Sequence, residues 1–469
     1  MKTLKKRIIS RLLFGGFLLI GFSPSCKKQN DFLNVKSVKS NVTPATLTDF
    51  QAVLDNTVEM NENGPIEGLI GTDNIYFTDV NLNAVDATSK NSYLWAKDLF
   101  QGSPSPDWSN PYQTIEYANI VLDGLSNLPA AETNSPSYNN VKGSALFYRS
   151  FAFYLLSQLF CKPYIKATAT TDLGIPLRLS SAISSKSTRA TVQQTYDQII
   201  NDLQLGATLL PQTPLYKTRP SSVAANALLA KVYLSMSDYT NAYNFSDKVL
   251  NNFNTLINYN TLKIGTANPF PSFAKGNPEV IYYSQTYGLI ATLVGSSGKG
   301  RIDTSLIKTY EQSDLRKSNL FTADGTTGLF KFKGSYTDNG YEFNGIATDE
   351  IYLIHAECLA RNGNLTGALS DLNNLLKNRY LTSGFQSYNT TDQNTLLARV
   401  LLERRKEMPF TGNIRWEDLR RLNQDPNFSI TLSRISNGVN YSLAANANRY
   451  IFPIPDQEVQ EEQLTQNPR

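Results

Sequence analysis

Two segments that lie 126 residues apart in this chain repeat the same helical pattern. Residues 223–250 are VAANALLAKVYLSMSDYTNAYNFSDKVL, and residues 349–376 are DEIYLIHAECLARNGNLTGALSDLNNLL. Each has an apolar helical stretch, a short polar turn and a second helical stretch. An alanine, Ala242 or Ala368, follows four positions after the turn. Because a small residue there lets paired helices approach closely, the pattern predicts two helix–turn–helix units.

This layout is typical of a tetratricopeptide unit. In the clearest helix, residues 364–380, apolar side chains at i, i+3, i+4 and i+7 form one buried face, and Asn364 is placed to cap it. Residues 147–159 are a candidate end for another pair of the same kind. The units are not in tandem, because a segment of residues 253–347, rich in Gly, Ser, Thr, Asn and Tyr, separates the two copies. Such a length predicts strands and functional loops rather than a structureless connection, with one strand in NPEVIYYSQ (277–285).

Helical periodicity extends over much of the remaining chain. Apolar spacing predicts helices, at differing strength, over residues 111–128, 140–161, 192–210, 221–236, 239–252, 348–362, 364–380 and 393–407. The connections between them are polar. We therefore expect a mainly α fold.

The N-terminus has the layout of a secretory signal. The basic stretch MKTLKKRIISR precedes eleven apolar residues, which are too few to cross a bilayer as a stable helix. Small residues then lead to Cys26, as in a bacterial lipoprotein, where that cysteine is lipidated and becomes the first residue. We expect residues 1–25 to be a lipoprotein signal peptide and residues 26–45 to be a flexible tether. Removal of the signal changes the formal net charge from +4 to −1, so the basic field that nucleic-acid binding needs is not expected.

The scarcity of histidine and cysteine limits the possible chemistry. The chain has one histidine, His355, in an apolar helical stretch where a core residue is expected rather than a general base. No Gly-x-Ser-x-Gly motif, phosphate loop or clustered metal ligands are present, and no motif marks a glycosidase carboxylate pair. We expect no enzymatic activity and no cofactor, with a structural calcium ion left open. Cys161 and Cys358 lie in or beside apolar helices, which favours buried free thiols over a disulfide.

The stretch LLERRKEMPFTGNIRWEDLRRLN (401–423) holds ten charged residues in the nineteen positions from Glu403 to Arg421. Six are positive and four negative, so the stretch nearly neutralises itself. Met408 to Phe410 interrupt a helix, and Trp416 begins a second helical stripe. We interpret the stretch as a brace between helices rather than as an active site.

Several phrases, in this order along the chain, resemble the SusD/RagB family. They are DLGIPL (172–177), TRATVQQTYDQIINDL (188–203), NPEVIYY (277–283), SLIKTYEQSDLR (305–316), DEIYLIHAECLARNG (349–363), LLERRKEMPFTGNIRWEDLRR (401–421) and RYIFPIPDQEVQEEQLTQNP (449–468). The lipoprotein N-terminus and the dispersed tetratricopeptide pairs agree with the same resemblance.

The resemblance implies a SusD-like fold with tetratricopeptide-type helix pairs in a right-handed scaffold and a loop-rich, partly β insertion. Residues 46–469 would form one globular domain, with helical scaffold at about 111–252 and 348–423 and a ligand-facing region at about 253–347. The implied function is that of an outer-membrane lipoprotein, facing the cell exterior, that binds a glycan and passes it to a SusC-like TonB-dependent transporter. Peptide binding, as in RagB-like relatives, and a protein-binding tetratricopeptide adaptor are the alternatives.

A glycan site needs exposed aromatic rings beside amides and carboxylates, because rings stack on the apolar face of a sugar while polar groups bind its hydroxyls. Two stretches, residues 71–81 and 282–301, contain such residues. The resemblance implies that site aromatics come from comparable regions. The predicted ligand residues are Asp73, Asn74, Tyr76, Trp95 and Tyr287. Packing of these rings in the core is the alternative. Packing is the expectation for Tyr282, and Trp108 is expected in the scaffold.

Overall fold

The computed structural model describes residues 44–133, 135–182, 188–288, 293–295, 297–334, 336–337 and 339–469. The predicted signal peptide, Cys26 and nearly all of the predicted tether lie outside these residues. Residues 45–469 form one compact unit. None of the described helices has both the length and the apolar character that crossing a membrane requires.

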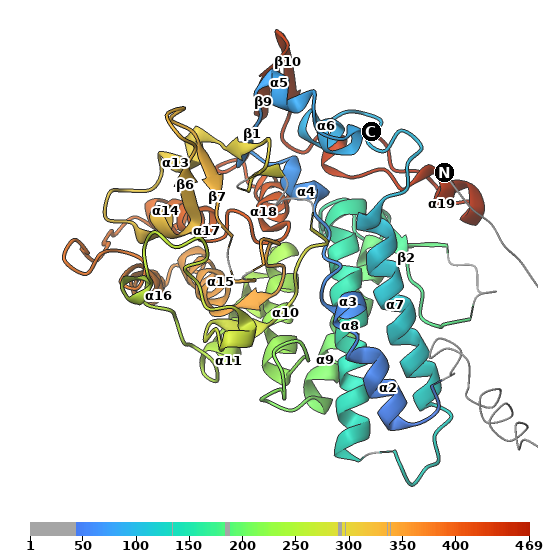
Figure 1. Cartoon of the computed structure of the whole chain (residues 1–469). Coiled ribbons are helices and arrows are strands. Elements are labelled where there is room, and N and C mark those ends of the chain that lie inside the picture. The colour runs from blue at the N-terminus through green and yellow to red at the C-terminus, as the bar shows by residue number, and fades with distance from the viewer. Residues whose placement is uncertain are drawn as a thin grey trace, which may run out of the picture. The chain divides into compact units, whose positions relative to one another are not determined.

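The described part of the chain is mainly α-helical, as expected (Figure 1). Its longer helices are α2 (Leu47–Leu54), α7 (Pro106–Leu125), α8 (Pro136–Phe160), α9 (Val192–Leu209), α10 (Ser222–Ser235), α11 (Tyr239–Leu250), α15 (Thr348–Arg361), α16 (Leu365–Leu376), α17 (Gln393–Glu407) and α18 (Ile414–Leu422). Its short helices are α3 (Thr57–Met60), α4 (Glu67–Ile70), α5 (Asp79–Leu82), α6 (Ala87–Tyr93), α13 (Thr304–Ile307), α14 (Leu315–Leu320) and α19 (Asp456–Glu462), with 3₁₀ turns η2 (Tyr259–Thr261), η3 (Phe273–Lys275) and η4 (Asn448–Tyr450).

All eight predicted helices are present, and three boundaries differ from the prediction by four or more residues, one of them the start of α8 at Pro136 rather than at residue 140. Helix α7 begins at Pro106 rather than at Pro111, because Pro106 takes the first helical position and Pro111 is accommodated inside the helix. Helix α16 ends at Leu376 rather than at residue 380. Beyond it the chain turns away, and Tyr380 forms an isolated bridge with Asp314.

The two predicted helix pairs are α10–α11 and α15–α16, and their turns have equivalent caps. Asp238 accepts a hydrogen bond from the backbone N–H of Asn241 at 3.1 Å, and Asn364 accepts one from Gly367 at 3.0 Å. Helix α11 packs directly on α15. The two pairs are therefore neighbours in space although the insertion separates them in sequence.

The other long helices continue the same stack. Helix α7 packs on α8, α8 on α9, α9 on α10, and α15 on α17. Residues 141–160 of α8 are buried except for Lys142, which explains why the helix has apolar residues on nearly every side. The apolar side chains form one large core among these helices, a second core beneath the insertion and a third between α15, α16 and α17.

The strands are short and antiparallel. A four-stranded sheet has the order β1 (Ile75–Tyr76), β5 (Arg301–Ile302), β7 (Phe330–Phe332), β6 (Phe321–Ala323). Three two-stranded pairs are β2 (Leu173–Pro176) with β3 (Arg189–Thr191), β4 (Val280–Tyr282) with β8 (Ile346–Ala347), and β9 (Leu432–Ser436) with β10 (Val439–Leu443). The insertion is therefore partly β, as expected, and β4 confirms the strand predicted in residues 277–285.

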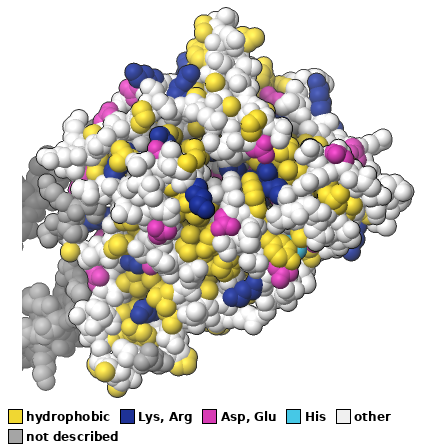
Figure 2. Space-filling model, turned by 180° about the vertical axis from the view of Figure 1, so that it is seen from behind, with side chains coloured by type: hydrophobic (Ala, Val, Ile, Leu, Met, Phe, Trp, Pro, Cys, Tyr) yellow, Lys and Arg dark blue, Asp and Glu magenta, His cyan; other side chains and the backbone are white. Residues whose placement is uncertain are grey.

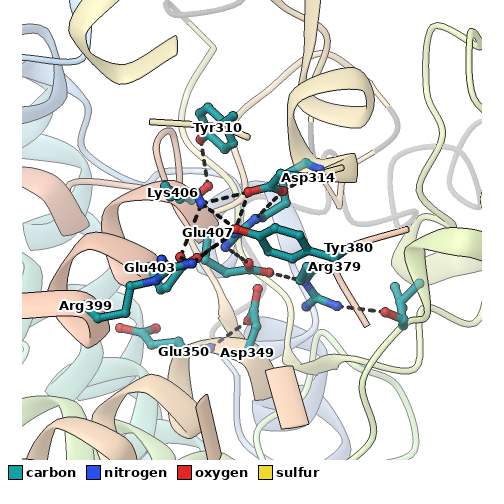
Figure 3. Close-up of polar contacts among 12 residues, drawn as sticks. Tyr310, Asp314, Asp349, Glu350, Arg379, Tyr380, Arg399, Glu403, Lys406 and Glu407 are labelled. Carbon is teal, nitrogen blue, oxygen red and sulfur yellow. Dashed lines mark hydrogen bonds and ion pairs between the residues drawn. The ribbon is translucent and has the colours of Figure 1, made fainter. Parts of the chain in front are cut away.

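The charged stretch of residues 403–421 forms a buried ionic network rather than an exposed cluster (Figure 3). Arg316 of α14 is fully buried and lies 2.5 Å from Glu403, 2.7 Å from Asp314 and 3.0 Å from Glu407. Lys406 joins the same acids, at 2.8 Å from Asp314 and 3.2 Å from Glu403. The network thus ties α17 to α14.

A second group of ion pairs ties α17 and α18 to α15. Arg404 lies 2.9 Å from Asp418 and 3.1 Å from Glu350, and all three side chains are buried. Arg421 pairs with Asp418 and, through both terminal nitrogens, with Glu357. The interpretation of this stretch as a brace between helices is confirmed.

Candidate functional site

Residues 71–82 connect the helical body to the four-stranded sheet. Strand β1 follows α4 and pairs with β5, so that Tyr76 is opposite Arg301. Thr78 then caps α5 by accepting a hydrogen bond from the backbone N–H of Asn81. This framework leaves the Tyr76 side chain exposed, at 36%. A fixed backbone thus presents an aromatic ring to solvent.

Asp73 lies at the start of this segment, between two arginines. Arg415 donates through two nitrogens to its carboxylate, at 2.8 and 2.9 Å, and Arg405 lies 3.1 Å away. Burial alone would raise the pKa of Asp73, but the charge and hydrogen bonds of Arg415 and the charge of Arg405 outweigh it and hold that pKa well below its ordinary value. We call Asp73, Tyr76, Arg405 and Arg415 the β1 face.

The structure corrects the predicted role of Asn74 and Trp95 as exposed ligand contacts. Asn74 is fully buried; it donates to the Pro409 carbonyl and accepts from Nε of Arg405. Trp95 is 2% exposed, and its indole N–H donates to the Gly71 carbonyl at 2.8 Å. Both side chains are buried and form hydrogen bonds with other groups of the protein. They support the β1 face from beneath.

Arg434 of β9 fixes the same segment from another side. Its guanidinium lies 3.8 Å from the centroid of Tyr93 and 4.3 Å from that of Trp95. It donates to the backbone carbonyls of Thr72 and Tyr93. Burial lowers the pKa of Arg434 to about 10, so the side chain remains a cation at neutral pH.

Tyr287, the fifth predicted residue, lies at a different place. Its backbone N–H donates to Gly64, and its half-buried ring packs on the core beneath the insertion. Burial, followed by the charges of Asp107 and Glu67, raises the pKa of Tyr287 far above its ordinary value. Asp73 and Tyr76 therefore lie in one segment and are both accessible to solvent, whereas Asn74 and Trp95 are buried and Tyr287 packs elsewhere.

Sequence reasoning missed Arg405 and Arg415 as members of the site. Both belong to the charged stretch assigned to the brace, but their side chains keep 15% and 11% exposure. Adjacent helical residues point in different directions, so Arg404 enters the core while Arg405 reaches Asp73. The only local indication that Arg405 has a different role was its position next to helical residues that are buried.

The β9–β10 hairpin projects beside α5 at the top of the molecule (Figure 1), and Asp79 of α5 accepts hydrogen bonds from its turn at Ser436 and Asn437. Exposed aliphatic side chains gather here, with Val80 at 79% and Ile435 at 78%. In Figure 2, acidic and basic side chains are interspersed over the face drawn, without a broad field of one sign. That surface agrees with the near-neutral charge expected after removal of the signal.

One pair of acids has the perturbed pKa values often found in catalytic sites. Burial raises the pKa of Glu67 to about 8, aided by the charge of Asp107, and burial raises that of Asp107 to about 6. However, both side chains are buried, at 3% and 0% exposure. Asp107 accepts from the backbone N–H groups of Ile66 and Glu67, and Glu67 accepts from Ser92 at 2.7 Å. The two carboxyl groups stabilise the start of α4, and their burial leaves no access for a substrate.

The single histidine and the two described cysteines, which are the remaining candidates for chemistry, also have structural roles. His355 contacts Asp371 at 2.5 Å and stacks on Tyr243, which agrees with the expected packing role. Cys161 and Cys358 are buried and free, as predicted. Within the described ranges, no group of three or more His, Cys, Asp or Glu side chains is arranged to hold a metal ion.

Comparisons with known proteins agree with this architecture. A family model described as starch-binding and associating with the outer membrane matches residues 31–234, and a model of the SusD family matches residues 304–469. SusD-like protein P2 of Formosa agariphila is 25% identical over 417 residues, which are 76% of this chain and 78% of that protein.

Solved structures share the fold over nearly the whole chain. A SusD superfamily protein of Bacteroides thetaiotaomicron has a TM-score of 0.72 and 21% identity, covering 90% of this chain and 100% of that one. Surface glycan-binding protein A of Bacteroides uniformis has a TM-score of 0.69 and 17% identity, covering 90% and 99%.

The stacked helix pairs and the partly β insertion define a SusD-like, mainly α fold. Together the two family matches cover more than half of the chain. The chain belongs to the SusD family.

Proposed function

We propose that this protein is a lipoprotein of the outer membrane, anchored through Cys26 and facing the cell exterior. It binds a nutrient oligosaccharide at the β1 face and delivers it to a SusC-like TonB-dependent transporter. The protein acts by binding rather than by catalysis.

The observation that carries the binding proposal is the exposed ring of Tyr76, which lies in the same segment as Asp73 and its ion pairs with two arginines, three residues after Asp73. The ring can stack on the C–H face of a sugar, and the charged groups can form strong hydrogen bonds to its hydroxyls. Because Asn74, Trp95 and Arg434 hold this segment from below, little ordering is needed on binding. The starch-binding description of one matching family model and the glycan-binding name of one structural relative support the ligand class.

Replacement of Tyr76 by alanine tests this site. Loss of one stacked ring should remove about 0.5–1.5 kcal/mol, so we expect affinity for a bound glycan to fall about 3- to 10-fold. Isothermal titration calorimetry against a panel of oligosaccharides would first identify a ligand and then measure the change. Tyr216→Ala removes a ring that is 60% exposed on a distant loop and should leave affinity unchanged.

The same titrations separate the alternatives. Unchanged affinity in Tyr76→Ala would place the glycan site elsewhere. Binding of oligopeptides with no binding of any glycan would replace the sugar proposal by the RagB-like one. Co-purification from outer membranes with a transporter supports the partner, whereas isolation with other proteins only would favour the adaptor alternative.

A further inference from the structure

A cavity of about 320 Å³ lies between the N-terminal half of α7 and the C-terminal helix α19. Figure 1 shows α19 near the upper end of α7, away from the projecting hairpin. Both halves of the chain contribute to its walls, which consist of Trp108, Ser109, Tyr112, Glu116, Pro176, Arg178, Glu458, Glu462 and Leu464. This volume is at the small end of the range for small-molecule sites.

The aromatic wall of the cavity is fixed in position. The rings of Trp108 and Tyr112 lie 4.8 Å apart, and Trp108 also packs edge-on against Phe160 at 4.9 Å. The Tyr112 hydroxyl donates to the Pro176 carbonyl at 2.8 Å. Because Trp108 is only 3% exposed, the partly buried ring of Tyr112 provides most of the aromatic surface, and its hydroxyl bond fixes its position.

Acidic side chains dominate the rest of the lining. Among the lining residues that the structure describes, three are acidic (Glu116, Glu458 and Glu462) and one is basic (Arg178), so their formal charge is −2. Burial raises the pKa of Glu458, against a hydrogen bond from Trp108, and the neighbouring charges of Glu461 and Glu462 raise it further. Among the residues that the structure describes, Oε2 of Glu462 is buried without a hydrogen-bond partner.

These features define what the cavity would attract. A cation would relieve the repulsion between the carboxylates and would also be stabilised by an aromatic face. A neutral sugar would use the rings but would leave the excess negative charge unmatched, and an anion would be repelled. An ammonium group on a compact polar body satisfies both the rings and the acids.

We propose that the cavity between α7 and α19 binds a small ligand that carries a primary ammonium group, of the amino-sugar class. The site is separate from the β1 face, since it uses α7, α19 and the loop after β2. It does not depend on the glycan site proposed above.

Titration calorimetry with glucosamine, N-acetylglucosamine and glucose at neutral pH tests the proposal. Glucosamine should bind about tenfold more tightly than the other two, because only it carries the cation. Glu462→Gln should weaken glucosamine binding about tenfold, which corresponds to about 1.4 kcal/mol. Asp456→Asn removes the same charge from an exposed residue on the same helix, outside the lining, and should leave affinity unchanged.

Three results would overturn the proposal. They are absence of glucosamine binding, equal binding of glucosamine and glucose, and equal losses in Asp456→Asn and Glu462→Gln. Melting curves of both variants should match the wild type, since each replaces a residue on the short surface helix α19. Tyr76→Ala should not change glucosamine affinity, so failure of one site can be told apart from failure of the other.

Discussion

At the scale of single residues, burial decides the role of each side chain more than residue type does. Tyr76 and Trp95 lie in the same region, yet one is exposed and the other is 2% exposed with its N–H bonded. Trp95 also has a positive φ of 53°, a conformation that a bulky residue adopts only where its surroundings compensate for the strain. A local pattern of aromatic and polar residues cannot distinguish these cases, because the partners of Trp95 come from distant segments. The sequence therefore indicates a candidate region but does not show which of its side chains face outward.

Glu342 provides a prediction at this scale. Burial raises its pKa from an ordinary 4.5 to about 8. Between these values the folded protein keeps a proton that the unfolded chain has lost, so the group reduces stability as pH rises, by up to about 1.4 kcal/mol per pH unit. The stability that this group contributes is complete below pH 4.5 and lost by about pH 8. We expect Glu342→Gln to flatten the fall in unfolding free energy between pH 5 and pH 8.

Urea denaturation at several pH values would measure this effect. Glu132→Gln changes an exposed glutamate and should retain the pH dependence of the wild type. Glu67, whose raised pKa is also about 8, should preserve part of the slope in the Glu342 variant. Identical slopes in Glu342→Gln and the wild type would contradict the prediction.

At the scale of secondary-structure elements, the long helices were predictable and the strands mostly were not. Each predicted helix has an apolar stripe repeated over three or more turns, which is a strong local signal. Most strands span only two to five residues, too few for alternation to be recognised. The β9–β10 hairpin was missed because its strands are short. Its pattern is also unclear, since its outward residues include the exposed Ile435 and Val439. Strand β4 was recognisable, since its three residues are all buried and apolar.

Loss of Arg404 should loosen the junction of three helices. The side chain joins α17 to Asp418 of α18 and Glu350 of α15, and its removal leaves buried carboxylates with less compensation. We expect Arg404→Ala to reduce the free energy of unfolding by about 3 kcal/mol and to leave glycan affinity nearly unchanged. Chemical denaturation and calorimetry would measure the two quantities.

Arg399→Ala is the matched control on the same helix. That side chain is 20% exposed, and its partner Glu403 keeps Lys406 and Arg316, so a smaller loss is expected. Weaker glycan binding in Arg404→Ala at unchanged stability would instead make the brace part of the binding site.

At the scale of the whole molecule, the proposed lipid anchor at Cys26 can be tested directly. The basic residues that make the full chain positive are concentrated before Cys26. We predict that Cys26→Ala moves the protein from the membrane fraction to the soluble fraction and abolishes labelling by a fatty-acid analogue. Cell fractionation with immunoblotting would measure this, and Cys161→Ala, which changes a buried free thiol, should remain in the membrane. Membrane retention of the Cys26 variant would show that the anchor lies elsewhere.

The pairing of β4 with β8 has a consequence for how such a protein can change. After α11 the chain reaches β4, continues through residues 283–345 and returns at β8, which pairs with β4 just before α15. Because the two ends of this excursion are held together, its length can vary at little entropic cost to the helices. Within it, β5 pairs with β1 beside Tyr76. The part of the excursion near β5 can therefore diverge between relatives, whereas Asp314 and Arg316 remain tied to α17 by the buried ionic network.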